Sequence, residues 1–107
     1  MFGRQYQKVV CADGFEMSVQ ASSGHYCSPR EDAGPYDAVE VGFPTAKDPQ
    51  LEKFAEDPGA EICKESGTVQ TVYGWVPAET VRQIIESHGG KTGGELPELA
   101  EVALIEE

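Results

Sequence analysis

The chain has 107 residues and carries 8 lysines and arginines against 19 aspartates and glutamates, a formal net charge of −11. This length fits one domain, and a hydrophobic fraction of 39% is enough for a single core, so the composition favours a folded chain over global disorder. Direct binding to nucleic acid is not expected, because affinity for phosphates depends on lysine and arginine. Apolar runs of only a few residues exclude a transmembrane helix, and residues 1–8 lack the apolar run of a signal peptide. We therefore expect no membrane contact and a cytoplasmic protein.

The negative charge is concentrated in the later part of the chain. Residues 1–30 carry three basic and two acidic residues, whereas residues 31–107 carry five basic and 17 acidic residues. Solubility is one explanation of this excess. The alternative is an acidic surface that binds a basic partner.

A β-hairpin is predicted near the N-terminus. Residues 15–21 alternate between apolar and polar side chains, the pattern of a half-buried strand, and residues 5–11 are also typical of a strand. Asp13 and Gly14 lie between them, and this dipeptide favours a tight turn because glycine tolerates a positive φ.

A loop, a third strand and a short helix are expected next. Two prolines and two glycines oppose regular structure in residues 22–35, and residues 36–43 predict a strand. Asp48 followed by proline is typical of a helix start, and Pro58 ends that helix. Its apolar stripe comprises Leu51, Phe54 and Ala55.

Residues 68–76 are rich in β-branched and aromatic side chains and predict a fourth strand. A second helix is expected from Pro77 to a C-cap at Gly89. Residues 89–94 have the composition of a flexible linker. The tail, residues 95–107, fits either a helix or an edge strand.

Together these elements predict an α+β fold: a mainly antiparallel four-stranded sheet, five-stranded if the tail joins it, with two helices packed on one face. We expect a single domain over residues 1–90. Residues 91–107 would then be a flexible linker and an acidic C-terminal tail.

The three cysteines include no C-x-x-C pair, so neither a metal site nor another cofactor is predicted. Cys11 and Cys63 are expected to be small apolar residues. His25 and Cys27 would point to the same side of an extended segment, where an imidazole can activate a thiol. They are weak candidates for a catalytic pair, because the pattern is unspecific.

The 22–36 loop is the best candidate for a binding site, because a long loop in a small domain is often functional. Arg30 with Tyr26 and Tyr36 could hold an anionic or planar ligand by hydrogen bonding and stacking. Glu31 and Asp32 could take part or be simply solvated. The alternative is that Tyr26 packs in the core and Arg30 pairs with a nearby acid.

Tyr73 and Trp75 are expected on one face of the fourth strand, either in the core or as a partner-binding or homodimer patch. Gly74 between them would mark a bulge or a close backbone approach. His88, at the end of the second helix, is expected to satisfy terminal carbonyls and the helix dipole.

The pattern MSVQAS..HYC.PR...GPY.AVE.GFP over residues 17–44 resembles a group of small uncharacterised bacteriophage proteins. The later segments TV..VYGWVP and HGG are also similar to that group, and the resemblance covers roughly residues 15–90. It implies a phage or prophage origin and action inside a bacterial host. It transfers no catalytic or binding residue.

The sequence favours a phage accessory protein that binds a host or defence protein stoichiometrically, through its acidic surface and the 22–36 loop. The first alternative is a protein that binds or sequesters a small, nucleotide-like ligand. The second alternative is a cysteine-dependent enzyme at His25 and Cys27. Catalysis is the less favoured class, because no convincing catalytic constellation is evident.

Overall fold

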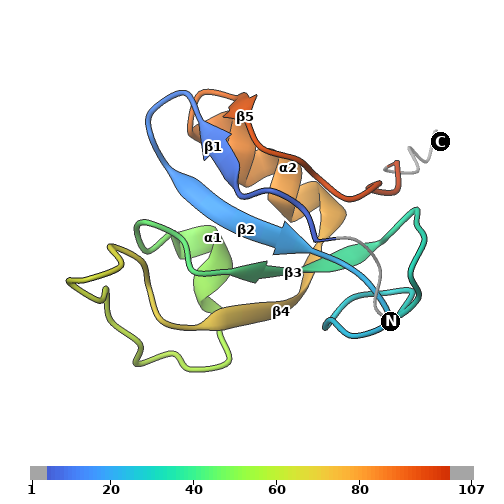
Figure 1. The fold of residues 1–107 in the computed structure, drawn as a ribbon, viewed down its shortest axis with the longest axis horizontal. Coiled ribbons are helices and arrows are strands. Elements are labelled where there is room, and N and C mark those ends of the chain that lie inside the picture. The colour runs from blue at the N-terminus through green and yellow to red at the C-terminus, as the bar shows by residue number, and fades with distance from the viewer. Residues whose placement is uncertain (1–4, 102–107) are drawn as a thin grey trace, which may run out of the picture.

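The structure is a computed structural model that describes residues 5–101. It confirms the α+β prediction: five antiparallel strands form one sheet in the order β4-β3-β2-β1-β5, and there are two helices (Figure 1). The strands are β1 (Val9–Cys11), β2 (Glu16–Gln20), β3 (Ala38–Gly42), β4 (Val72–Pro77) and β5 (Lys91–Gly93). The helices are α1 (Pro49–Glu52) and α2 (Ala78–Ser87).

The predicted hairpin is confirmed. Val9 of β1 lies opposite Met17 of β2, and the turn between them has Gly14 at a φ of 95°. The carboxylate of Asp13 accepts a hydrogen bond of 2.9 Å from the backbone N–H of Phe15. This short-range bond stabilises the turn, as expected for an aspartate that precedes a glycine.

One core lies between the sheet and the helices. The alternating side chains of the strands supply its sheet side, and the apolar stripe of α2 and one residue of α1 supply its helix side. The fully buried members include Val9, Met17, Val19, Val39, Val41, Leu51, Tyr73, Val76, Val81 and Ile84. Tyr36, from the loop before β3, belongs to the same core.

Helix α1 is shorter than the predicted helix, whose apolar stripe extended to Ala55. Asp48 caps it by accepting from the N–H of Gln50 at 2.8 Å, but the helix ends at Glu52. The next residues leave the helical path because they pair with the outer edge of β4. The carbonyl of Phe54 accepts from Gly74, and Ala55 forms a bridge with Tyr73. Phe54 and Ala55 therefore pack against the core from an extended segment.

Strand β4 begins four residues later than predicted from the sequence. Residues 68–71 precede the sheet, and Val69 forms an isolated bridge with Ile62 instead. The 58–71 loop that results lies at the opposite end of the sheet from the 22–36 loop (Figure 1).

The glycine-rich segment that the sequence predicts as a linker contains the fifth strand. Residues Lys91–Gly93 pair antiparallel with β1, so the fifth strand comes from the linker and not from the tail. Gly89 and Gly90 have φ values of 92° and 98°, which allow the chain to reverse after α2 and return along β1. The sequence prediction failed here because flexible composition does not prevent pairing with an open sheet edge.

The beginning of the predicted tail also packs on the domain. Leu96 and Leu99 lie against the core, and the N–H of Ala100 donates to the carbonyl of Tyr36 at 2.8 Å. The rest of that tail, residues 102–107, lies outside the described residues. Among residues 5–101, no helix has both the length and the apolar character needed to cross a membrane.

Candidate functional site

A β-bulge in β4 places Trp75 at the surface. Val39 of β3 lies opposite Val76, and Val41 lies opposite Tyr73, so β4 has one extra residue between these pairs. Trp75 occupies this irregularity with a φ of 51°, in the left-handed region. Its side chain is 50% exposed, whereas that of Tyr73 is 1% exposed. The prediction that the two aromatics share a face is therefore wrong, because the extra residue changes the alternation.

Tyr26 from the 22–36 loop packs on this bulge. Its ring stacks on that of Trp75, with centroids 4.9 Å apart and planes 17° apart. The N–H of Trp75 donates to the carbonyl of Tyr26 at 3.0 Å. A Cβ on Gly74 would lie 3.3 Å from the Cβ of Tyr26, so glycine allows the close approach that was expected at this position.

The guanidinium of Arg30 completes the cluster. Its Cζ lies 5.7 Å from the centroid of the Tyr26 ring, within the range of a cation–π contact. Arg30 is exposed and forms no ion pair with any residue in the 5–101 range that the structure describes. We call Tyr26, Arg30 and Trp75 the aromatic patch. Two separate sequence predictions, one on the loop and one on the strand, thus meet at one surface.

The other predicted binding residues lie elsewhere. Tyr36 and Tyr73 are each 1% exposed, and burial raises the pKa of both phenols, so neither offers a ring to a surface ligand. The hydroxyl of Tyr36 donates to the backbone carbonyl of Glu31 at 2.8 Å. Glu31 and Asp32 are exposed, and Asp32 accepts from the N–H of Ser23 at 2.8 Å. These contacts hold the 22–36 loop on the domain.

The side chains of His25 and Cys27 both hydrogen-bond to Ser22, at different atoms of that residue. The Nδ1 of His25 lies 2.7 Å from the hydroxyl oxygen of Ser22. The thiol of Cys27 is 2% exposed and donates to the carbonyl of Ser22 at 3.1 Å. Burial raises the pKa of this thiol, and this effect outweighs the lowering by the Ser22 hydrogen bond and the Arg30 charge. A reactive cysteine needs the opposite shift, so the geometry does not supply an activated nucleophile.

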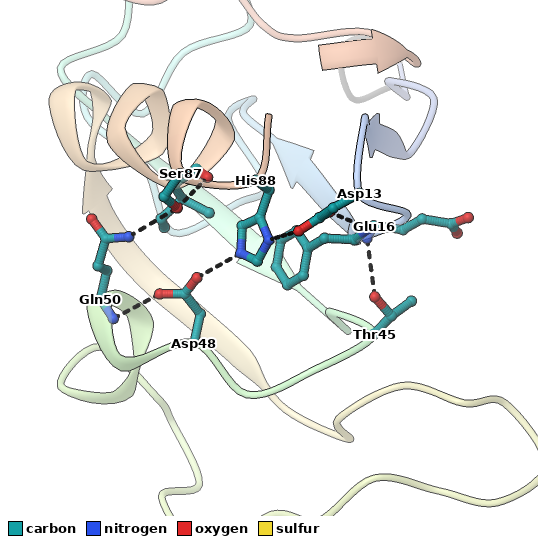
Figure 2. A network of polar contacts seen from close by, with 9 residues as sticks. Asp13, Glu16, Thr45, Asp48, Gln50, Ser87 and His88 are labelled. Atoms are coloured by element: carbon teal, nitrogen blue, oxygen red, sulfur yellow. Dashed lines mark hydrogen bonds and ion pairs between the residues drawn. The ribbon is translucent and has the colours of Figure 1, made fainter. Parts of the chain in front are cut away.

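A second polar cluster surrounds His88, which the sequence assigned only a local role (Figure 2). Its Nδ1 lies 2.7 Å from Asp13 Oδ2, and its Nε2 lies 2.9 Å from Asp48 Oδ2. The imidazole also stacks on Phe15, with centroids 3.9 Å apart and planes 7° apart. We call Asp13, Asp48 and His88 the histidine clamp.

The carboxylates of the clamp favour the protonated form of His88. Burial lowers the pKa of His88, but its hydrogen bonds to Asp13 and Asp48 and their charges raise it by more, so the net direction is upward. The pKa of Asp13 is lowered, first by the Phe15 N–H and then by His88. Each ring nitrogen of His88 lies within hydrogen-bond distance of a carboxylate, so neither is free to act as a base. The clamp therefore joins the hairpin turn, α1 and α2, and its role is structural.

Sequence reasoning missed the clamp because its contacts span 75 and 40 residues. The turn aspartate and the cap aspartate were each recognised from their neighbours. Each uses one carboxylate oxygen locally and the other on His88. An aspartate in a short-range motif leaves one oxygen free for a distant partner, and this is the one signal that the sequence offered.

Comparison with protein families, with characterised proteins and with solved structures gave no match to this chain. The family resemblance noted in the sequence therefore stays a prediction, and function has to be argued from the aromatic patch and its surroundings.

Proposed function

We propose that this protein acts by stoichiometric binding to another protein, and that the aromatic patch is the centre of the contact. In the phage setting that the sequence resemblance suggests, the partner is a host or defence protein in the bacterial cytoplasm. The 22–36 loop and the acidic surface around the patch complete the interface.

The observation that carries this proposal is the conformation of Trp75. A left-handed backbone costs a non-glycine residue about 1–2 kcal/mol. Half of the side chain then remains in contact with water, so its burial contributes less than a core position would give. The strain opposes folding, and the exposure limits the stabilisation that burial of the side chain returns. Strain of this kind is typical of functional positions, where it presents a side chain to a ligand or partner.

The composition of the patch supports protein binding. Tryptophan, tyrosine and arginine are the residue types most enriched at the energetic centres of protein interfaces. Here all three are joined by stacking and cation–π contacts, so their side chains are ordered before a partner arrives. Prior ordering lowers the entropy that binding would otherwise cost.

A direct test is affinity capture from bacterial lysate at low and high salt. The wild-type chain should retain a specific protein, and Trp75→Asn should lose it. Ile62→Ser is the matched control, because Ile62 is 47% exposed and lies in the loop at the other end of the sheet. Recovery of no specific protein at either salt level, or equal recovery by Trp75→Asn, would contradict the proposal.

A small anionic ligand with a planar group is the second candidate function. The observation in its favour is that Arg30, which lies over the ring of Tyr26, forms no ion pair within residues 5–101. A thermal-shift series with nucleotides would then show stabilisation that Arg30→Ala removes. A flat response to every nucleotide would exclude this function and leave the protein-binding proposal unaffected.

A further inference from the structure

We infer that the group which the partner places on Trp75 is a cation, the side chain of a lysine or arginine in a basic segment. This inference rests on the proposed function and specifies the chemistry of the partner. Its basis is the free face of an aromatic pair together with the charge of the residues around it.

The stack leaves one side of Trp75 available. Tyr26 covers one face of the indole with nearly parallel planes, yet the tryptophan is still 50% exposed. Half of the tryptophan therefore stays accessible to a partner despite the stack. The faces of aromatic rings carry negative electrostatic potential, and among aromatic residues tryptophan binds cations best.

The other ring of the stacked pair already makes a contact of this kind. The guanidinium of Arg30 lies over the ring of Tyr26. The cation–π contacts found within residues 5–101 are this one and that of Lys53 with Phe54. Trp75, the more exposed ring of the stacked pair, is available for a cation from outside.

Acidic residues lie near the patch. Glu40 accepts from the N–H of Tyr26 at 3.2 Å through a carboxylate oxygen. Asp37, Glu79 and Glu101 line a hollow of about 190 Å³ together with Pro77, which follows Trp75 by two residues on β4. Two residues of a strand span about 6.5 Å, so the backbone of Trp75 lies near one edge of this hollow.

The basic residues nearby neutralise only part of this charge. Arg82 lies 3.8 Å from Glu79 and donates to the carbonyl of Ala100 at 2.8 Å. Asp37 and Glu101 have no ion pair within residues 5–101. A negative rim concentrates cations and repels anions, so charge complementarity selects a basic partner over an acidic one.

Fluorescence can test this inference directly, because Trp75 is the one tryptophan in the sequence. The probe is a pentalysine amide, with pentaglutamate and a glycine–serine pentapeptide of equal length as comparisons. Pentalysine should give a saturable change in emission that disappears between about 50 and about 500 mM salt, because the Debye length falls to a few ångströms. The two comparison peptides should give none.

Variants separate the aromatic contact from general attraction to an acidic protein. By calorimetry, Trp75→Asn should weaken pentalysine binding roughly 3- to 30-fold, the range that corresponds to a cation–π contact. Asp37→Asn should also weaken it, whereas Glu61→Gln, at an exposed acid in the far loop, should weaken it less. Equal affinity for wild type and Trp75→Asn, or a stronger emission change with pentaglutamate, would overturn the inference. If Trp75-dependent capture from lysate still occurs, the proposed function stands and only the chemistry of the partner is wrong.

Discussion

The Nε2 of His88 lies 2.9 Å from a carboxylate oxygen of Asp48, and the same carboxylate caps helix α1 by accepting from the N–H of Gln50. One buried side chain therefore fixes both the start of α1 and the end of α2 (Figure 2). On its other side, His88 binds Asp13 in the hairpin turn. Three elements that are distant in sequence meet at one histidine, and this makes the stability of the fold dependent on protonation.

The first prediction concerns pH. His88 has a raised pKa in the folded state, so its contribution is complete below its ordinary value of 6.5 and is lost as the pH rises through the raised value. Asp13 has a lowered pKa, so its contribution is complete above its ordinary value of 3.8 and is lost as the pH falls through the lowered value. The clamp should stabilise the fold most between these ordinary values. Urea unfolding from pH 4 to 8 should show stability falling above about pH 6.5.

His88→Gln is the control for this pH dependence, because glutamine can hydrogen-bond but does not titrate. Its unfolding free energy should be lower than that of the wild type in mild acid and should not fall in the same way above neutrality. An unchanged pH profile in His88→Gln would show that another group causes the dependence.

The second prediction compares the two aspartates of the clamp. Asp48→Ala removes an N-cap, worth about 0.5–2 kcal/mol, and also the partner of a partly buried donor on His88. Asp13 is exposed, so Asp13→Ala should cost less. Chemical denaturation of both variants measures the difference. A larger loss in Asp13→Ala would show that the turn, and not the helix cap, is the main anchor of the clamp.

Local patterns predicted more of the fold than of the site. The hairpin, β3 and α2 were predictable because each depends on the alternation, the turn or the cap of its own residues. Strand β5 was not, because residues 91–93 form a strand only where β1 offers an open edge. In the site, residue type identified Tyr26, Arg30 and Trp75 separately. Their contact depends on the β-bulge in β4, and Gly74 is the one short-range signal of that bulge.

The third prediction concerns thiol reactivity. Cys27 is 2% exposed and has a raised pKa, whereas Cys63 lies in the 58–71 loop and is partly exposed. Because the thiolate is the reactive form, alkylation of the native protein at neutral pH should modify Cys63 first. Cys27 should react only at the rate of local unfolding. Mass spectrometry over a time course would show the order, and early modification of Cys27 would revive the cysteine-enzyme alternative.

The fourth prediction separates binding from stability at Trp75. Trp75→Asn loses a stacking contact worth about 0.5–1.5 kcal/mol, but asparagine adopts the left-handed conformation more easily, which recovers part of a strain of about 1–2 kcal/mol. The unfolding free energy should therefore change by less than about 1 kcal/mol. Tyr73→Asn is the contrast, because Tyr73 is buried in the core and its loss should cost several times more. A large destabilisation in Trp75→Asn would mean that the indole serves the fold and not a partner.

The last prediction concerns residues 91–101. The sequence placed the domain boundary at residue 90, so removal of residues 91–107 would be harmless on that interpretation. The structure shows that this deletion removes β5, exposes the edge of β1 and uncovers the apolar surface under Leu96 and Leu99. The truncated chain should melt at a clearly lower temperature or fail to fold.

Leu99→Ala in the full chain supplies a milder test, with an expected loss of about 1 kcal/mol or more, because its side chain is only partly buried. Lys91→Gln, a change at an exposed side chain of the same segment, should leave the melting temperature unchanged. If the truncated chain melts at the same temperature as the wild type, the domain ends at residue 90, as the sequence alone predicts.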